Sequence, residues 1–243
     1  PWRGSRDPYK ILVSEVMLQQ TQVERVIPKY KAFLKEFPSA KVLARAQLSK
    51  VLKQWQGLGY NRRGKFLHEA AKVIVKDGYT GKLPGVGPYT RAAIEAFAHN
   101  KPTVFIETNI RTVFLHHYYS SILQKTKTVM DVEILPLIER DLNLSKMEPR
   151  DFYSALMDYG SHLKRSGVKI NKQSKHYTKQ KKFEGSERQK RGTILRELLK
   201  KPHTVHALAK SLNVEKEKTA QLLALLVLEG LIQKDGSRYS VAD

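Results

Sequence analysis

A lone carboxylate within an uncharged stretch is the first feature of the sequence that could support chemistry. Glu15 lies next to apolar side chains in the segment SEVMLQQTQV (14–23). Apolar surroundings raise the pKa of a carboxyl group, and an acid with a pKa near neutrality can protonate a leaving group. The alternative is an exposed glutamate near the start of a helix, capped by Ser14. The same segment carries Gln20, whose amide could read a base edge or wedge into a stack of bases.

A second carboxylate, Glu107, follows the apolar run Val-Phe-Ile at 104–106 and precedes Asn109. Two carboxylates in different environments can divide the work of an active site, one as the acid and the other as an electrostatic stabiliser. The alternative is a glutamate that merely begins a helix.

A glycine-containing turn, LPGVGPYT (83–90), could hold a phosphate group. Gly85 and Gly87 allow the backbone to approach a ligand closely. The helix that we expect after them offers unpaired N–H groups and the positive end of its dipole. Such a turn could bind phosphate without a charged side chain, although the same pattern also occurs in ordinary turns.

The elements that must position these residues are mostly helices. Over residues 1–162 the apolar residues recur at helical spacing, as in Ile11, Leu12 and Val16. Glycine and proline interrupt the pattern at several places, and strand-like alternation is scarce. We therefore predict an all-α fold for this part of the chain.

The 243-residue chain is strongly basic and contains no cysteine. Its 44 Lys and Arg outnumber its 23 Asp and Glu, which gives a formal net charge of +21. Such a charge favours a polyanionic partner, most simply nucleic acid, over a surface that is only solubilising. The missing cysteines exclude disulfides, thiolate zinc sites, cysteine-ligated iron–sulfur clusters and a cysteine nucleophile.

Two further segments follow residue 162. Residues 163–191 contain eleven Lys or Arg and two Glu, which predicts a basic linker or loop. Residues 192–243 predict helices over 192–199, 205–212 and 214–231, with Thr204 as the cap of the second. The dipeptide Asp235-Gly236 between two short β-like runs predicts a hairpin. Three helices and a hairpin are typical of a winged helix-turn-helix module; the alternative is a helical bundle that binds a protein partner.

The sequence also predicts where the protein works. No apolar run reaches the ~20 residues that a membrane span requires, and no signal peptide is recognisable at Pro1. We therefore expect an intracellular protein of the cytoplasm or nucleoid, a monomer, with further residues upstream because the chain lacks an initiator Met.

Several motifs occur in the order found in a known enzyme family. Residues 1–162 resemble the MutY-like adenine DNA glycosylases of the helix-hairpin-helix (endonuclease III) superfamily. The resemblance is carried by Trp2-Arg3, SEVMLQQTQV, WQGLGY (55–60), LPGVGPYT, Asn109 and MDYG (157–160). It implies a two-lobed helix-hairpin-helix fold and a monofunctional glycosylase of base excision repair. Its partner would be double-stranded DNA with a mismatch or lesion, such as adenine opposite 8-oxoguanine or G.

The resemblance also implies roles for individual residues. Glu15 matches the glutamate that protonates adenine, and Glu107 stands where the family has an aspartate that stabilises the sugar cation. Asn109 matches the asparagine that follows, and Tyr89 occupies the position at which enzymes with lyase activity carry a lysine. DNA contacts are implied for Arg3, for the wedge residues Gln20 and Tyr60, for the hairpin residues Leu83, Gly85, Val86 and Gly87, and for the basic residues Lys175, Lys179, Lys181 and Lys182.

The chain departs from the family pattern in four ways, of which the first is a stretch between Gly81 and Gly85 that is shorter than in the family, where another helix precedes LPGVG. Glu107 replaces the aspartate, the cluster cysteines are absent, and the predicted winged-helix module stands in place of the family's C-terminal domain. We expect no cofactor, with lysine and arginine contacts to phosphate replacing the cluster loop; a monovalent cation at the hairpin is the alternative. Two other functions stay open: a glycosylase for another base, such as mismatched U or T or hypoxanthine, and a catalytically inactive DNA-binding protein.

Overall fold

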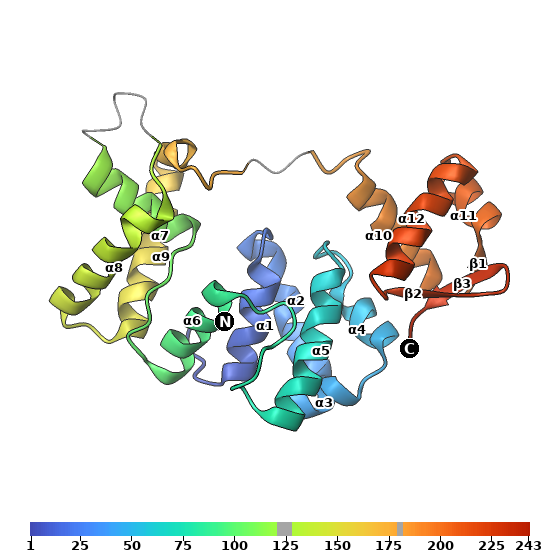
Figure 1. The fold of residues 1–243 in the computed structure, drawn as a ribbon, viewed down its shortest axis with the longest axis horizontal. Coiled ribbons are helices and arrows are strands. Elements are labelled where there is room, and N and C mark those ends of the chain that lie inside the picture. The colour runs from blue at the N-terminus through green and yellow to red at the C-terminus, as the bar shows by residue number, and fades with distance from the viewer. Residues whose placement is uncertain (121–127, 179–181) are drawn as a thin grey trace. The chain divides into compact units, whose positions relative to one another are not determined.

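The computed structural model describes residues 1–120, 128–178 and 182–243, and these are mostly helical, as predicted (Figure 1). The contacts of the chain group it into two compact units. Unit 1 comprises Pro1–Leu12 and Gly87–Gln180, and unit 2 comprises Val13–Val86 and Lys181–Asp243. The sequence predicted three consecutive segments, 1–162, 163–191 and 192–243, whereas each unit combines two separate stretches of the chain. The three-segment division stays a prediction of domain organisation.

Unit 1 is a helical body with an aromatic core. Its elements are the first part of α1 (Pro8–Leu18), α6 (Pro88–His99), α7 (Thr108–Phe114), the π-helix η1 (Leu115–Tyr119), α8 (Asp131–Ser145), α9 (Pro149–Arg165) and the 3-10 helix η2 (Ile170–Gln173). Phe105 stacks on Tyr153 with 3.9 Å between the ring centroids. Helices α7 and α9 pack so closely that a Cβ atom at Gly160 would overlap the carbonyl oxygen of Asn109. Only glycine permits this approach.

Unit 2 begins with the remainder of α1 and continues with four helices. These are α2 (Val23–Glu36), α3 (Ala40–Arg45), α4 (Leu48–Trp55) and α5 (Arg62–Asp77). Trp55 is fully buried, and its indole packs against Gly64 of α5, where an added Cβ would lie 2.9 Å from the ring. The indole Nε1 also donates to the Gly59 carbonyl at 3.2 Å, so the tryptophan fixes the loop between α4 and α5.

The C-terminal part of unit 2 contains three helices and a small antiparallel sheet. The helices are α10 (Glu187–Leu198), α11 (Val205–Leu212) and α12 (Lys216–Leu228), and the strands are β1 (His203–Thr204), β2 (Ile232–Asp235) and β3 (Arg238–Val241). The sheet order is β1-β3-β2, and Ile232 pairs with Val241. Thr204 accepts a hydrogen bond from the Ala207 N–H and so caps α11 as predicted. The predicted hairpin turn is also present, with Gly236 at φ 53°.

Two predicted helix bounds in this part are wrong. Helix α10 begins at Glu187 rather than 192, because the Ser186 side chain accepts a hydrogen bond from the Gln189 N–H and starts the helix earlier. Helix α12 ends at Leu228 rather than 231, because Gly230 adopts φ 63° and ends the helical conformation.

Part of the predicted basic linker is fastened to unit 1. Helix α9 extends through Arg165, and Ile170 packs against the hydrophobic core of this unit. The Asn171 side chain donates to the Thr112 hydroxyl at 2.6 Å, and Ser174 forms a β-bridge with Val129. Residues 163–178 therefore hold their place without any cysteine ligand.

Among the helices in the described ranges, none is long and apolar enough to cross a membrane.

Candidate active site

Glu15 lies in the third turn of α1 and is 7% exposed. The helix is capped eight residues earlier, where the Asp7 side chain accepts a hydrogen bond from the Tyr9 N–H. Ser14 and Met17 are buried beside it. The alternative of an exposed glutamate capped by Ser14 is therefore wrong, and the carboxyl group belongs to the buried face of a helix, as the apolar surroundings predicted.

The end of α1 is held by Arg63 of α5. Its guanidinium donates to the carbonyl oxygens of Val16 at 2.9 Å and Met17 at 3.2 Å, and also to that of Gln19. The last carbonyl groups of a helix lack partners within the helix, and the planar guanidinium supplies five donors. Burial lowers the pKa of Arg63 to about 10, so the group stays charged at neutral pH.

The same guanidinium binds the loop before α5. It donates to the carbonyl oxygens of Leu58 and Gly59, each at 3.1 Å, and to the Thr21 hydroxyl at 3.1 Å. Arg63 was not among the residues predicted from the sequence. One signal could have found it: the arginine stands four residues before the buried Leu67 and thus on the apolar face of α5.

Arg63 brings together the loops of two predicted wedge residues. Gln20 and Tyr60 directly follow Gln19 and Gly59, whose carbonyl oxygens accept from the Arg63 guanidinium. Both wedge residues have left-handed backbone conformations, with φ 54° and 47°. This conformation is unfavourable for residues other than glycine, so the hydrogen bonds to the preceding carbonyls stabilise a strained arrangement. Gln20 is exposed and Tyr60 is half-buried.

The glycine turn before α6 has different requirements at its two glycines. Gly85 has φ 71°, and an added Cβ would lie 2.7 Å from Cβ of Phe66. The Val86 N–H donates to the Leu83 carbonyl at 3.2 Å and closes the turn, while Leu83 itself is buried. Gly87 is the N-cap of α6, where no side chain caps the helix and an added Cβ would meet open space. Residues 78–87 form no helix of their own.

In unit 1, Glu107 caps α7. Its Oε1 atom accepts hydrogen bonds from the N–H groups of Asn109 at 2.6 Å and Ile110 at 2.9 Å. Burial raises the pKa of Glu107, and these two hydrogen bonds oppose the rise. Glu107 therefore begins a helix, which was the alternative that the sequence left open. It is also a partly buried carboxyl group, and burial makes its charged form less favourable.

Two other predicted residues, Asn109 and Tyr89, belong to the same unit as Glu107. The Nδ2 atom of Asn109 is 3.4 Å from the second oxygen of Glu107, whereas its buried Oδ1 atom has no hydrogen-bond partner in the described part of the chain. Tyr89 of α6 packs edge-on against Phe105, with 5.6 Å between ring centroids. Unit 1 thus gathers Glu107, Asn109 and Tyr89, while Glu15, Gln20 and Tyr60 belong to unit 2.

The predicted basic contacts are scattered over both units. Arg3 forms an ion pair with Asp158 of the MDYG segment. Lys175 is exposed and fixed through its backbone N–H, which donates to the Val129 carbonyl at 3.0 Å. Lys182 is also exposed and lies 3.9 Å from the Glu184 carboxylate. Lys179 and Lys181 lie outside the described residues.

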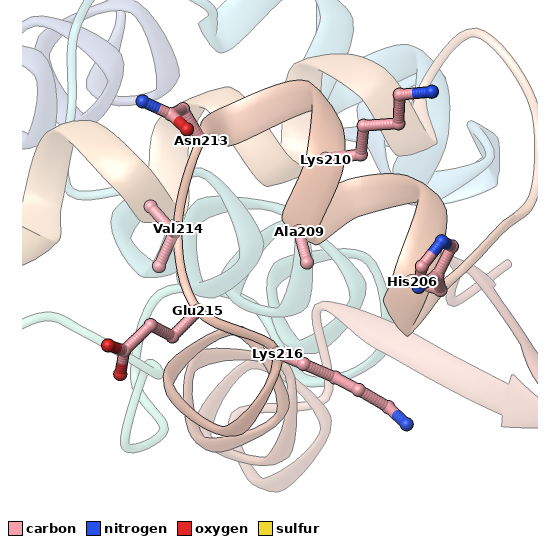
Figure 2. Close-up of a pocket in the computed structure, with 7 residues that line it drawn as sticks. All are labelled: His206, Ala209, Lys210, Asn213, Val214, Glu215 and Lys216. Carbon is pink, nitrogen blue, oxygen red and sulfur yellow. The ribbon is translucent and has the colours of Figure 1, made fainter.

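The turn between α11 and α12 surrounds a shallow hollow (Figure 2). The residues that line it are His206, Ala209, Lys210, Asn213, Val214, Glu215 and Lys216. Farther along α12 the surface becomes apolar, and Leu228 is 84% exposed.

No cluster of three His, Asp or Glu side chains that could hold a metal ion occurs in the stretches that the structure describes.

A scan against protein-family models matches residues 13–136 to the HhH-GPD superfamily of base excision DNA repair proteins. The chain is 38% identical over 135 residues to an adenine DNA glycosylase of Buchnera aphidicola subsp. Baizongia pistaciae, covering 51% of this chain and 38% of that protein. It is 36% identical over 177 residues to an adenine DNA glycosylase of Mycolicibacterium smegmatis, covering 66% and 57%.

The chain therefore covers about two fifths of the length of the first relative and less than three fifths of the second. Among solved structures, the chain is similar to one described as a thermostable thymine-DNA glycosylase. That match has a TM-score of 0.58 and 27% identity, and it covers 73% of this chain and 87% of the other.

Proposed function

Because the chain belongs to the HhH-GPD superfamily of base excision DNA repair proteins, we propose that it is a monofunctional DNA N-glycosylase that excises mispaired adenine. The observation that carries this proposal is the burial of Glu15 within α1, in the segment that resembles the adenine glycosylases. Burying a carboxyl group costs free energy, so an acid at this position indicates a function that offsets the cost. The relatives named adenine DNA glycosylases support the choice of base.

The proposed reaction begins when the target nucleotide leaves the base stack, which costs a few kcal/mol. The Glu15 carboxyl group then gives its proton to a ring nitrogen of adenine. The bond between adenine and C1′ of the sugar breaks, and its electron pair departs with the base. Water adds to C1′ of the cationic sugar and gives up a proton to the Glu15 carboxylate, which restores the acid. Glu107 would stabilise the positive charge on the sugar, and Tyr89 supplies no amine that could attack it, so water is the nucleophile.

The remaining predicted residues would bind and open the duplex. Gln20 and Tyr60 would fill the space that the extruded nucleotide leaves, and the 83–87 turn would bind a backbone phosphate through N–H groups. The residues present do not fit the iron–sulfur cluster of the resembling enzymes, because the chain contains no cysteine. We propose that exposed lysines of the segment 163–191, among them Lys175 and Lys182, bind the DNA backbone in place of the cluster loop.

A second candidate is excision of thymine or uracil opposite G. Two observations favour it: the similarity to the thymine-DNA glycosylase covers 87% of that chain, and Glu107 replaces the expected aspartate. The extra methylene changes where the carboxylate lies relative to the sugar. The general acid and the wedge residues would be the same, since the fold does not fix the substrate.

Single-turnover base release from a panel of duplexes tests both candidates. The panel contains A opposite 8-oxoguanine, A opposite G, T and U opposite G, and hypoxanthine. We expect adenine release, and we expect Glu15→Gln to lower the rate about 10²–10⁴-fold, the usual range for general acid catalysis. Glu24→Gln replaces an exposed glutamate of α2 and serves as the matched control.

Each outcome of this panel decides one point. Release of thymine or uracil, without release of adenine, would support the second candidate function with the same general acid. A Glu15→Gln variant that works as fast as Glu24→Gln would remove Glu15 from the mechanism. Tight binding of every duplex without release of any base would identify a DNA-binding protein that is not an enzyme.

A further inference from the structure

Helix α10 contacts the predicted wedge residue Tyr60. This helix is the first of the C-terminal module, by which we mean residues 187–243 of unit 2. Arg188 of α10 donates a hydrogen bond to the hydroxyl of Tyr60 through its Nη1 atom. Its guanidinium carbon also lies 5.2 Å from the centroid of the Tyr60 ring. A guanidinium that both covers an aromatic ring and binds its hydroxyl restricts the side chain in two ways, in position and in rotation.

Other contacts fasten α10 and its module to the same region of unit 2. Arg191, one helical turn after Arg188, forms an ion pair with Glu229. The Lys65 ammonium donates to the Glu229 carbonyl at 2.8 Å, and Lys65 stands in α5 only five residues after Tyr60. At the end of the chain, the Asp243 side chain accepts a hydrogen bond from the Ser49 N–H at 2.7 Å.

An aromatic and basic surface extends from this contact. The guanidinium of Arg188 also lies 5.7 Å from the ring of Phe183, which is 56% exposed. Lys182 precedes Phe183 and is itself exposed. The surface next to Tyr60 therefore combines exposed cations with an aromatic ring, the combination that binds unstacked nucleic acid.

We infer that Arg188 is a positioning residue for Tyr60, through which the C-terminal module takes part in opening the duplex. The inference rests on the proposed function, since it takes Tyr60 to be the wedge. Tyr60 already has a left-handed backbone, and Arg63 fixes the carbonyl group just before it. Arg188 fixes the other end of the residue, so that the ring is ordered before it meets DNA. A pre-ordered side chain loses less conformational entropy on insertion.

Duplexes that differ only in the cost of opening test this inference. With adenine opposite 8-oxoguanine, we expect Arg188→Ala to slow single-turnover release about 10-fold, as for the loss of one charged hydrogen bond. With adenine opposite an abasic site, the base is already unpaired, and we expect a change of less than about 2-fold. Arg196→Ala is the matched control, because Arg196 is an exposed arginine of the same helix.

A double-mutant cycle tests whether Arg188 acts through Tyr60. Tyr60→Phe keeps the ring and removes the hydroxyl, and we expect Arg188→Ala combined with Tyr60→Phe to be no slower than the worse single variant. Equal losses on both duplexes, multiplicative effects in the cycle, or an Arg188→Ala variant as fast as Arg196→Ala would each overturn the inference.

A binding readout separates this inference from the proposed function. In the Glu15→Gln background, 2-aminopurine at the target position reports unstacking by its fluorescence without base release. We expect Arg188→Ala to reduce the fluorescence increase several-fold at saturating protein. If the wild type releases no base but Arg188→Ala still reduces unstacking, the proposed function fails and the inference stands. If base release depends on Glu15 but unstacking does not depend on Arg188, the inference alone fails.

Discussion

At the scale of single residues, the two carboxylates are held in different ways. Glu15 is buried in the middle of a helix, whereas Glu107 stands at the start of one and accepts two backbone hydrogen bonds. Hydrogen bonds from N–H groups favour the charged form of a carboxyl group, and burial disfavours it. Burial therefore raises the pKa of Glu107, while the two hydrogen bonds favour the charged form that its proposed role as a stabiliser of positive charge requires.

Replacing Glu107 by Gln separates stability from activity. The amide oxygen of glutamine can still accept from the N–H groups of Asn109 and Ile110, but the charge is lost. We expect base release to fall at least about 10-fold, since charge stabilisation of this kind is worth several kcal/mol. We expect no loss of melting temperature at pH 8. Glu148→Gln is the control, because Glu148 is an exposed N-cap glutamate whose side chain makes no capping hydrogen bond.

The pH dependence of stability follows from the raised pKa of Glu107. The folded protein holds this proton more tightly than the unfolded chain does. The contribution of Glu107 to stability is complete below the ordinary value of 4.5 and is lost as the pH rises through the raised pKa. The melting temperature of Glu107→Gln relative to wild type should therefore increase between pH 4 and pH 8. A difference that decreases over this range would contradict the assigned pKa direction.

At the scale of elements, one guanidinium connects α1 with α5 and the loop before it. Arg63 makes six hydrogen bonds, five of them to backbone carbonyl groups and one to the Thr21 hydroxyl. This arrangement orders the segment between the proposed acid and the wedge residues. The position of Glu15 therefore depends on a residue that takes no part in the chemistry.

Arg63→Lys should both destabilise the protein and slow base release. A lysine ammonium has three donors and cannot reach all the carbonyl groups, and each buried carbonyl left without a partner costs about 1–3 kcal/mol. We expect the free energy of unfolding to fall by more than about 2 kcal/mol in urea titrations. Arg62→Lys, at the neighbouring exposed position, should change neither quantity. Equal behaviour of the two variants would show that the network contributes little.

The close contact of α9 with α7 permits a second test at this scale. In Gly160→Ala, the new methyl group would overlap the Asn109 carbonyl, and one of the two helices must move. We expect the free energy of unfolding to fall by about 1–3 kcal/mol, measured by thermal unfolding. In Gly192→Ala, on α10, the methyl group meets open space, and we expect a gain of about 0.5–1 kcal/mol. A Gly160→Ala variant as stable as wild type would contradict this packing.

At the scale of the whole molecule, the net charge of +21 predicts a large electrostatic contribution to the proposed binding of DNA. Binding that neutralises phosphates releases counterions, so affinity falls steeply with salt. We expect Lys182→Ala to reduce the slope of log K against log salt by about 0.9, the value for one phosphate contact. Fluorescence anisotropy at several KCl concentrations measures this slope. Lys31→Ala, at an exposed position of α2, should leave it unchanged. An unchanged slope for Lys182→Ala would exclude that lysine from the DNA surface.

The whole-molecule view also explains how the chain manages without cluster cysteines. Residues 163–178 are held by the Asn171–Thr112 hydrogen bond, by the bridge of Ser174 to Val129 and by apolar packing of Ile170. The same stretch keeps its lysines exposed to solvent, as at Lys175. Ordinary packing and hydrogen bonds therefore order this stretch.

The sequence by itself determined the features that depend on neighbouring residues. Helical periodicity predicted the all-α part, Thr204 predicted the cap of α11, and Asp235-Gly236 predicted the hairpin, because caps and turns are formed within a few residues. For Glu15 the local sequence left a buried acid and an exposed, capped glutamate both open, and only the resemblance to the adenine glycosylases favoured the buried acid.

Only the tertiary structure decided the contacts between distant parts of the chain. Arg63 reaches α1 across more than 40 residues, and Arg188 reaches Tyr60 across 128. Likewise, Gly160 is required by a carbonyl group of another helix. Such pairings depend on how helices pack, and a one-dimensional pattern carries no signal for which surface meets which. The residues that support the proposed site therefore became visible only once the chain was folded.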